Sequence, residues 1–176
     1  MDNEALFFTI FNLAGKNPAL DTLMIFGARF LIYLTFLLMF VLAFKGGAKE
    51  RKVIILVLLS LPLVFLIIAV IHLFFIEPRP FISYQFTPLI PFPFINDPSF
   101  PSRHASIISA IAFSYYYFKS KWAPLFFIFA IWVGVSRIYV GVHYPLDILG
   151  GVMVGIVSLI ITKQIVKFLK IRFGLG

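Results

Sequence analysis

Three short groups of polar residues in this sequence have the types and spacing needed to hold and cleave a phosphate. They are Glu77-Pro78-Arg79-Pro80, Pro101-Ser102-Arg103-His104, and Ser136-Arg137 followed by His143 and Asp147. Each group lies at the end of a long apolar stretch, where ionisable side chains are costly and usually have a function.

The arginines of these groups predict an anion-binding site. Arg79, Arg103 and Arg137 each carry a planar fork that can grip phosphate oxygens with two donors. Placed around one cavity they repel each other unless an anion lies between them. Ser102 is suited to cap a helix that follows it, which would turn the free backbone N–H groups of residues 103–105 toward the same anion.

The histidines and the aspartate predict a nucleophile and an acid. His143 and Asp147 are four residues apart, and Pro145 between them suits a first helical turn, so both side chains would share one face. A carboxylate bonded to one imidazole nitrogen fixes the tautomer and leaves the other nitrogen free to attack phosphorus. His104 is then placed to protonate the leaving oxygen and later to take a proton from water.

The elements that must position these residues are membrane helices. Of the 176 residues 61% are hydrophobic and only 12% are charged, too few charges to cover a soluble surface. We expect an all-α fold, a polytopic transmembrane helix bundle that forms a single domain over residues 1–176. The spans are predicted over residues 22–44, 53–76, 104–118, 123–142 and 146–167. The third is short and rich in serine, which predicts that it is packed among the others.

Two segments outside the spans also carry predictions. Residues 1–20 are predicted to lie in the membrane interface, with a short helix over 4–14. Residues 77–101 hold seven of the chain's 11 prolines, interleaved with phenylalanine. Neither helix nor sheet should persist through such a stretch, and an apolar irregular loop could cover a lipid substrate.

The distribution of basic residues predicts the orientation of the chain across the membrane. Ten lysines and arginines fall on one side if five spans alternate, with only Glu50 against them: Lys45, Lys49, Arg51, Lys52, Lys119, Lys121, Lys163, Lys167, Lys170 and Arg172. That side should be cytoplasmic, which places all three polar groups at the periplasmic or exterior face of the cytoplasmic (inner) membrane. The net charge of +8 therefore reflects topology, and no nucleic-acid partner is expected.

The three polar groups, taken together, closely resemble the signature of the type 2 phosphatidic acid phosphatases. Their signature is Lys, six residues, Arg-Pro; then Pro-Ser-Gly-His; then Ser-Arg, five residues, His, three residues, Asp. Most of its positions match in identity and spacing: Arg79, Pro80, Pro101, Ser102, His104, Ser136, Arg137, His143 and Asp147. The resemblance implies metal-independent hydrolysis without a cofactor, a nucleophile at His143, a general acid at His104, and phosphate binding by Arg79, Ser102 and Arg137.

Two positions depart from the signature. His72 stands where the family has lysine, and Arg103 where it usually has glycine. We expect His72 to replace the lysine in binding phosphate, and Arg103 to add a contact to a larger or second phosphate. The compact loops resemble bacterial members that act on undecaprenyl pyrophosphate, phosphatidylglycerophosphate or the 1-phosphate of lipid A, so the expected partners are a lipid phosphate or pyrophosphate substrate and membrane lipids.

Several alternatives stay open at the level of sequence. His72, His104, His143 and Asp147 could bind zinc, although the arginines around them disfavour a cation. A transporter would place its charges near the bilayer midplane, where only Arg29 lies. A phosphotransferase differs from a phosphatase only in its acceptor. The Gly151 and Gly155 pair favours close packing within the bundle over dimerisation, and the oligomeric state is left open.

Overall fold

The structure, a computed structural model, describes residues 2–92 and 96–173, with side chains up to residue 169. These residues form helices and no strands, which confirms the all-α prediction. In chain order the helices are α1 (Asn3–Phe11), α2 (Pro18–Arg29), α3 (Leu31–Lys45), α4 (Ala48–His72), α5 (Pro80–Ser83), α6 (Arg103–Tyr117), α7 (Ala123–Tyr139) and α8 (Pro145–Phe173).

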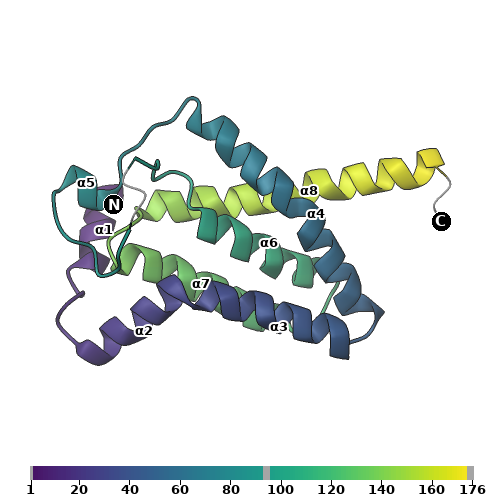
Figure 1. The fold of residues 1–176 in the computed structure, drawn as a ribbon, viewed down its shortest axis with the longest axis horizontal. Coiled ribbons are helices and arrows are strands. Elements are labelled where there is room, and N and C mark those ends of the chain that lie inside the picture. Colours follow the sequence, from purple (N-terminus) through teal and green to yellow (C-terminus); the bar gives the residue numbers. More distant parts are fainter. Residues whose placement is uncertain (1, 93–95, 174–176) are drawn as a thin grey trace.

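Five helical segments run back and forth along the long axis of the molecule: α2 with α3, then α4, α6, α7 and α8 (Figure 1). Helices α4 and α8 are each long and apolar enough to cross a membrane, and α2 with α3 qualifies as a third if the pair is one bent span. Helices α6 and α7 have 15 and 17 residues, which is short for a span. The arrangement is that of a multi-pass membrane protein.

Helix α6 is enclosed by its neighbours, as its serine content predicts. Most of its residues are buried, among them Ser106, Ser109 and Ser114. Its closest neighbour is α8, and the contact depends on two glycines of α8. A Cβ on Gly151 would lie 2.6 Å from the carbonyl oxygen of Ser102, and one on Gly155 would lie 2.6 Å from that of Ser106. The glycine pair therefore serves packing inside the bundle.

The first predicted span, 22–44, is broken. Helices α2 and α3 meet at Phe30 with a bend of 56°. The carbonyl of Ala28 is one of the last four of α2, which have no partner within their own helix, and it accepts a hydrogen bond from Arg137 Nη1 of α7 at 3.2 Å. A tertiary contact thus stabilises the bend.

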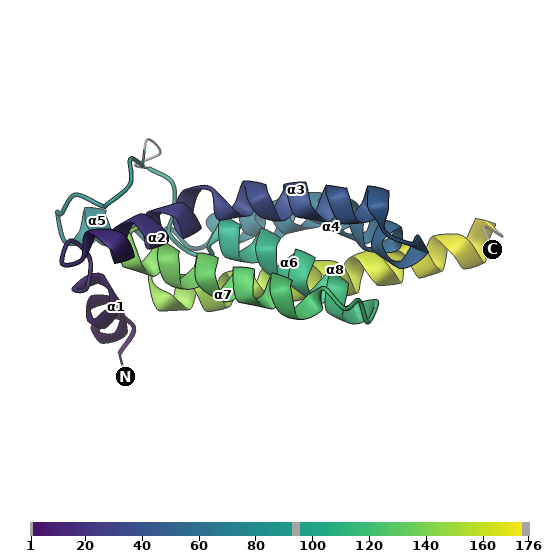
Figure 2. The same cartoon turned by 90° about the horizontal axis from the view of Figure 1, so that it is seen from below.

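One end of the bundle carries α1, α5 and the irregular chain between α4 and α6 (Figure 1, Figure 2). Helix α1 ends at Phe11, three residues earlier than predicted, and its Phe7 is fully buried against Tyr144, with ring centroids 5.5 Å apart. The prediction that residues 77–101 hold no helix is wrong at α5, where Pro80 occupies the first turn that proline tolerates. Phe81 is buried there, so this part of the segment is anchored to the bundle.

Large apolar side chains cover the outside of the bundle. Tyr33 and Leu37 of α3, Leu66 of α4 and Ile131 of α7 are each more than half exposed. In water such a surface would aggregate, whereas lipid chains cover it without cost. The opposite end of the bundle from α1 holds the Gly46-Gly47 connection, the turn between α6 and α7, and the C-terminal part of α8 (Figure 1).

Candidate active site

Five of the residues singled out in the sequence line one cavity of about 640 Å³. They are Arg79, Arg103, His104, Arg137 and His143. They come from the chain before α5, the first turn of α6, the end of α7 and the α7–α8 connection, so the fold brings together all three sequence groups. Arg29 and Asp97 also line the cavity, and its apolar wall includes Ile32 and Phe36 of α3 and Phe65 of α4.

Arg79 is held in place by the loop around it. Its Nε and Nη2 donate to the carbonyl oxygens of Asp97 and Pro98, both at 3.1 Å, and its Nη1 donates to that of Val142 at 2.9 Å. The guanidinium also lies 4.1 Å from the ring centroid of Phe92. Burial and the charge of Arg103 lower the pKa of Arg79 to about 10, so it remains a cation at neutral pH.

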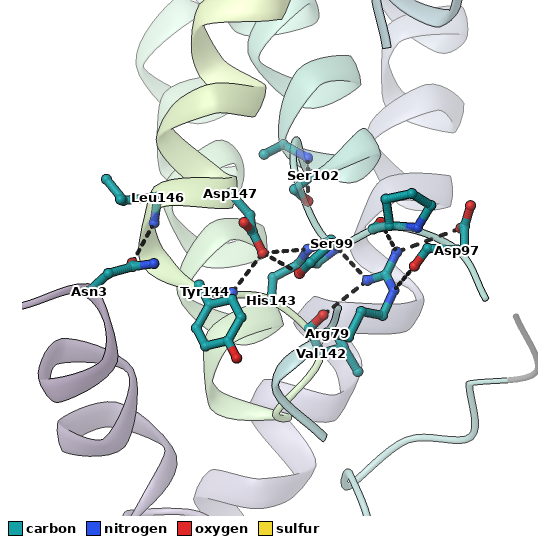
Figure 3. A network of polar contacts seen from close by, with 12 residues as sticks. Asn3, Arg79, Asp97, Ser99, Ser102, Val142, His143, Tyr144, Leu146 and Asp147 are labelled. Carbon is teal, nitrogen blue, oxygen red and sulfur yellow. Dashed lines mark hydrogen bonds and ion pairs between the residues drawn. The ribbon is translucent and has the colours of Figure 1, made fainter. Parts of the chain in front are cut away.

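His143 and Asp147 form the predicted contact. His143 Nδ1 lies 3.2 Å from Asp147 Oδ2, and the same oxygen accepts hydrogen bonds from the Ser99 hydroxyl at 2.5 Å and the Tyr144 amide at 2.8 Å (Figure 3). Asp147 is fully buried, and its position therefore fixes the ring. The sharp turn that delivers His143 passes through Gly141, whose φ of +85° suits glycine.

The opposite nitrogen of His143 faces the cavity. Arg79 Nη1 lies 3.1 Å from Nε2 and has only hydrogens to offer, so Nε2 is an acceptor and the proton sits on Nδ1, toward Asp147 (Figure 3). Burial and the positive charges of Arg137 and Arg79 lower the pKa of His143 well below its ordinary value. The imidazole is therefore neutral at physiological pH, the form in which Nε2 has a lone pair to donate.

Arg137, like Arg79, is a nearly fully buried cation of the cavity. Its side chain is 4% exposed, and its Nη1 donates to the Ala28 carbonyl at 3.2 Å. Its Nε has no hydrogen-bond partner among the described residues. A buried guanidinium with spare donors and no carboxylate beside it is suited to an anion that arrives from the cavity.

The start of α6 supplies the remaining predicted groups. Ser102 is the N-cap of the helix, with its hydroxyl accepting from the Ala105 amide at 3.5 Å. Its own amide donates to the Asp147 carbonyl at 2.9 Å, which ties the start of α6 to the start of α8. His104 lies in the first turn of α6, partly exposed to the cavity and facing the same space as His143.

The two positions that depart from the family signature differ in placement. Arg103 forms an ion pair with Asp97, so its fork already has a carboxylate partner. His72 ends α4, half-buried, and is not among the residues that line the cavity. Its Nε2 finds no hydrogen-bond partner in the described part of the chain.

Sequence reasoning missed Asp97 and Ser99 as parts of this site. Asp97 pairs with Arg103 and lies 3.6 Å from Arg79 Nη2, while Ser99 bonds Asp147. Both lie in the proline-rich segment, where no periodicity indicates which way a side chain points. Their nearness to the Pro101-Ser102 motif was the only signal. The zinc alternative lacks a ligand set, because no three histidine or acidic side chains of the described residues gather closely enough to hold a metal ion.

Comparison with known proteins places this geometry among lipid phosphatases. Residues 53–171 match the model of the PAP2 superfamily. The chain is 32% identical to the undecaprenyl-diphosphatase BcrC of Bacillus subtilis over 172 residues, which cover 98% of this chain and 84% of the relative. The match spans all five helical segments.

Two solved structures share the fold. Aquifex aeolicus LpxE superposes with a TM-score of 0.71 at 30% identity, covering 92% of this chain and 94% of that one. The transmembrane PAP2-type phosphatidylglycerolphosphate phosphatase from Bacillus subtilis gives a TM-score of 0.57 at 24% identity, covering 96% and 86%.

Proposed function

This chain belongs to the PAP2 superfamily of phosphatases, and we propose that it removes the terminal phosphate of a polyprenyl pyrophosphate such as undecaprenyl pyrophosphate. The single observation that carries the chemistry is the orientation of His143, which is bonded to Asp147 through Nδ1 and turns Nε2 into a cavity lined by arginines. The choice of lipid is supported by the similarity to BcrC along nearly the whole chain.

The reaction proceeds in two displacements. Nε2 of His143 attacks the terminal phosphorus, the bond from phosphorus to the bridging oxygen breaks, and His104 donates a proton to that oxygen as the lipid monophosphate leaves. Water then attacks the phosphohistidine, His104 takes its proton, and inorganic phosphate departs with His143 restored. Asp147 keeps the tautomer throughout, and a bound phosphate favours the protonated form of His104 that the first step needs.

The arginines have separate tasks in this scheme. Arg137 binds the phosphate oxygens with the donors that the protein leaves free, and Arg79 exchanges its contact with Nε2 for one with the incoming phosphate. The amides at the start of α6, behind the Ser102 cap, add neutral donors and the positive end of the helix dipole. Together they stabilise the charge that spreads over the equatorial oxygens in the transition state.

We further propose that the site faces the periplasm or the cell exterior in the cytoplasmic membrane. The basic turns of the chain lie at the opposite end of the bundle from the α7–α8 connection and the chain before α5 (Figure 1), both of which carry residues of the cavity. Basic loops are retained on the cytoplasmic side. The substrate would therefore be a lipid whose headgroup is displayed on the outer leaflet.

The test is phosphate release from undecaprenyl pyrophosphate by the purified protein in detergent. His143→Ala should abolish both release and an acid-labile phosphoenzyme, Asp147→Asn should slow turnover by up to about 10⁴-fold, and EDTA should change nothing. Full activity of His143→Ala would overturn the covalent mechanism. Phosphate recovered on a second lipid, with none free in solution, would identify a phosphotransferase instead.

A further inference from the structure

Arg29 is a cation of the cavity that none of the family motifs includes. It is the last residue of α2, at the 56° bend, and its exposed side chain contributes to the cavity lining. Its guanidinium lies 5.5 Å from the ring centroid of Phe30. No carboxylate of the described residues pairs with it. An unpaired arginine within an apolar span is expensive and calls for an anion.

The position of Arg29 is set by the bend. Ala28, its neighbour in the chain, accepts a hydrogen bond from Arg137, and Ile32 and Phe36 of the same segment line the apolar part of the cavity. Arg29 therefore stands at the boundary between the arginine-lined end, where the reacting phosphate sits, and the wall that faces the lipid chain. A diphosphate lying with its terminal phosphorus at His143 would direct its second phosphate to this boundary.

The other arginines have partners that Arg29 lacks. The fork of Arg103 is paired with Asp97, and Arg79 donates to three backbone carbonyls. Arg137 is buried and donates to the Ala28 carbonyl. Arg29 keeps its planar fork available for a further anion.

We propose that Arg29 binds the phosphate that stays on the lipid, and so makes the site selective for diphosphate over monophosphate lipids. This inference rests on the proposed function. The contact is made with the leaving group rather than with the transferred phosphoryl group, so Arg29 is a specificity-determining residue. Neutralising the charge of the departing lipid monophosphate also helps the bond to the bridging oxygen break.

The test compares two polyprenyl substrates of equal chain length, one with a diphosphate and one with a monophosphate. Arg29→Gln should lower kcat/KM for the diphosphate by about 10- to 100-fold, the loss of one charge-assisted contact, and change that for the monophosphate by less than about threefold. Arg29→Lys should keep an intermediate preference. The inhibition constants of inorganic pyrophosphate and phosphate, used as competitive inhibitors, give the same comparison without a lipid chain.

A matched control variant keeps this test specific. Lys16→Gln removes one exposed charge just before α2, outside the cavity, and should leave both substrates unchanged. The assignment would be overturned if Arg29→Gln lowered kcat/KM equally for the diphosphate and the monophosphate lipid. It would also be overturned if Arg103→Gly changed the preference between the two lipids while the Arg29 variants did not. If the wild-type protein releases no phosphate from the diphosphate lipid, the proposed function itself fails, and that result does not depend on any Arg29 variant.

Discussion

His143 is held from both sides, and this defines the resting state of the site. Asp147 accepts from Nδ1, while Arg79 donates to the nitrogen that would attack phosphorus. Without substrate the lone pair of Nε2 is therefore occupied, and in the proposed mechanism the incoming phosphate frees it by drawing the guanidinium onto its own oxygens. The proposed mechanism would thus couple phosphate binding to activation of His143 through the single side chain of Arg79.

The charge of Arg79, together with burial and the charge of Arg137, should lower the pH at which the acidic limb of the pH profile falls. A cation 3.1 Å from Nε2 disfavours protonation of His143, so Arg79→Gln should raise the pKa of His143. Because the proposed mechanism needs the neutral imidazole, kcat/KM of the variant should then be lost at a higher pH on the acidic side than that of the wild type. Profiles of kcat/KM measured with the same lipid isolate the shift, since ionisation of the substrate is common to all variants.

Arg79→Lys is the matched control for this prediction. It keeps the charge and loses the fork that holds the carbonyls of Asp97 and Pro98, so activity should fall while the acidic limb stays near its wild-type position. If the acidic limb of Arg79→Gln also stays at its wild-type position, His143 is not the group that titrates there.

The sequence predicts many of the individual site residues, because their contacts follow from spacing and capping patterns within a few neighbouring residues. The four-residue spacing of His143 and Asp147 around Pro145 predicts their contact, and a serine before an apolar run predicts the Ser102 cap. No such local pattern predicts the placement of Ser99 and Asp97. Their side chains are directed by hydrogen bonds to groups far away in the sequence, Asp147 and Arg103, within a segment that has no helical or extended period.

Among the elements, α6 and α8 carry the site between them. The start of α6 brings Ser102 and His104, the start of α8 brings Asp147, and the amide of Ser102 bonds the Asp147 carbonyl. Gly151 lies one turn further along α8, where the absence of a side chain lets the two backbones approach. The geometry of the candidate site and the packing of the two helices therefore depend on the same contact.

The substitution Gly151→Ala should lower both the stability of the protein and its activity. The new Cβ would meet the Ser102 carbonyl oxygen at 2.6 Å, a backbone atom that cannot swing aside, so we expect a loss of about 1–3 kcal/mol in stability together with reduced kcat. Thermal unfolding in detergent and phosphate release measure the two effects. Gly47→Ala is the control, since a Cβ there meets only Glu50 Oε2 at 3.9 Å, and a similar loss in that variant would argue against the packing explanation.

The bend between α2 and α3 is the feature of the elements that sequence patterns do not reveal. Residues 22–44 form one apolar stretch without proline, which predicts a single continuous span. The break at Phe30 depends instead on a donor from α7, because Arg137 binds the carbonyl of Ala28. Patterns within one segment cannot report a partner that lies in another.

The whole molecule has two unlike ends, and their placement across the membrane can be measured. The chain contains no cysteine, so a single introduced thiol reports one position. In intact cells, a thiol at Thr87→Cys, in the segment beside the cavity, should react with an impermeant reagent, and one at Lys49→Cys, in the first turn of α4, should react only after lysis. Both positions are exposed. The reverse pattern would place the cavity in the cytoplasm.

The link between Arg137 and Ala28 also bears on how the protein is made. The two residues are 109 positions apart, so the first span leaves the ribosome long before its partner in α7 exists. During that interval the Ala28 carbonyl lacks the donor that later satisfies it, and a polar backbone group in lipid needs one from its own helix. We therefore expect the nascent first span to be more nearly straight, and to bend at Phe30 once α7 has been inserted beside it.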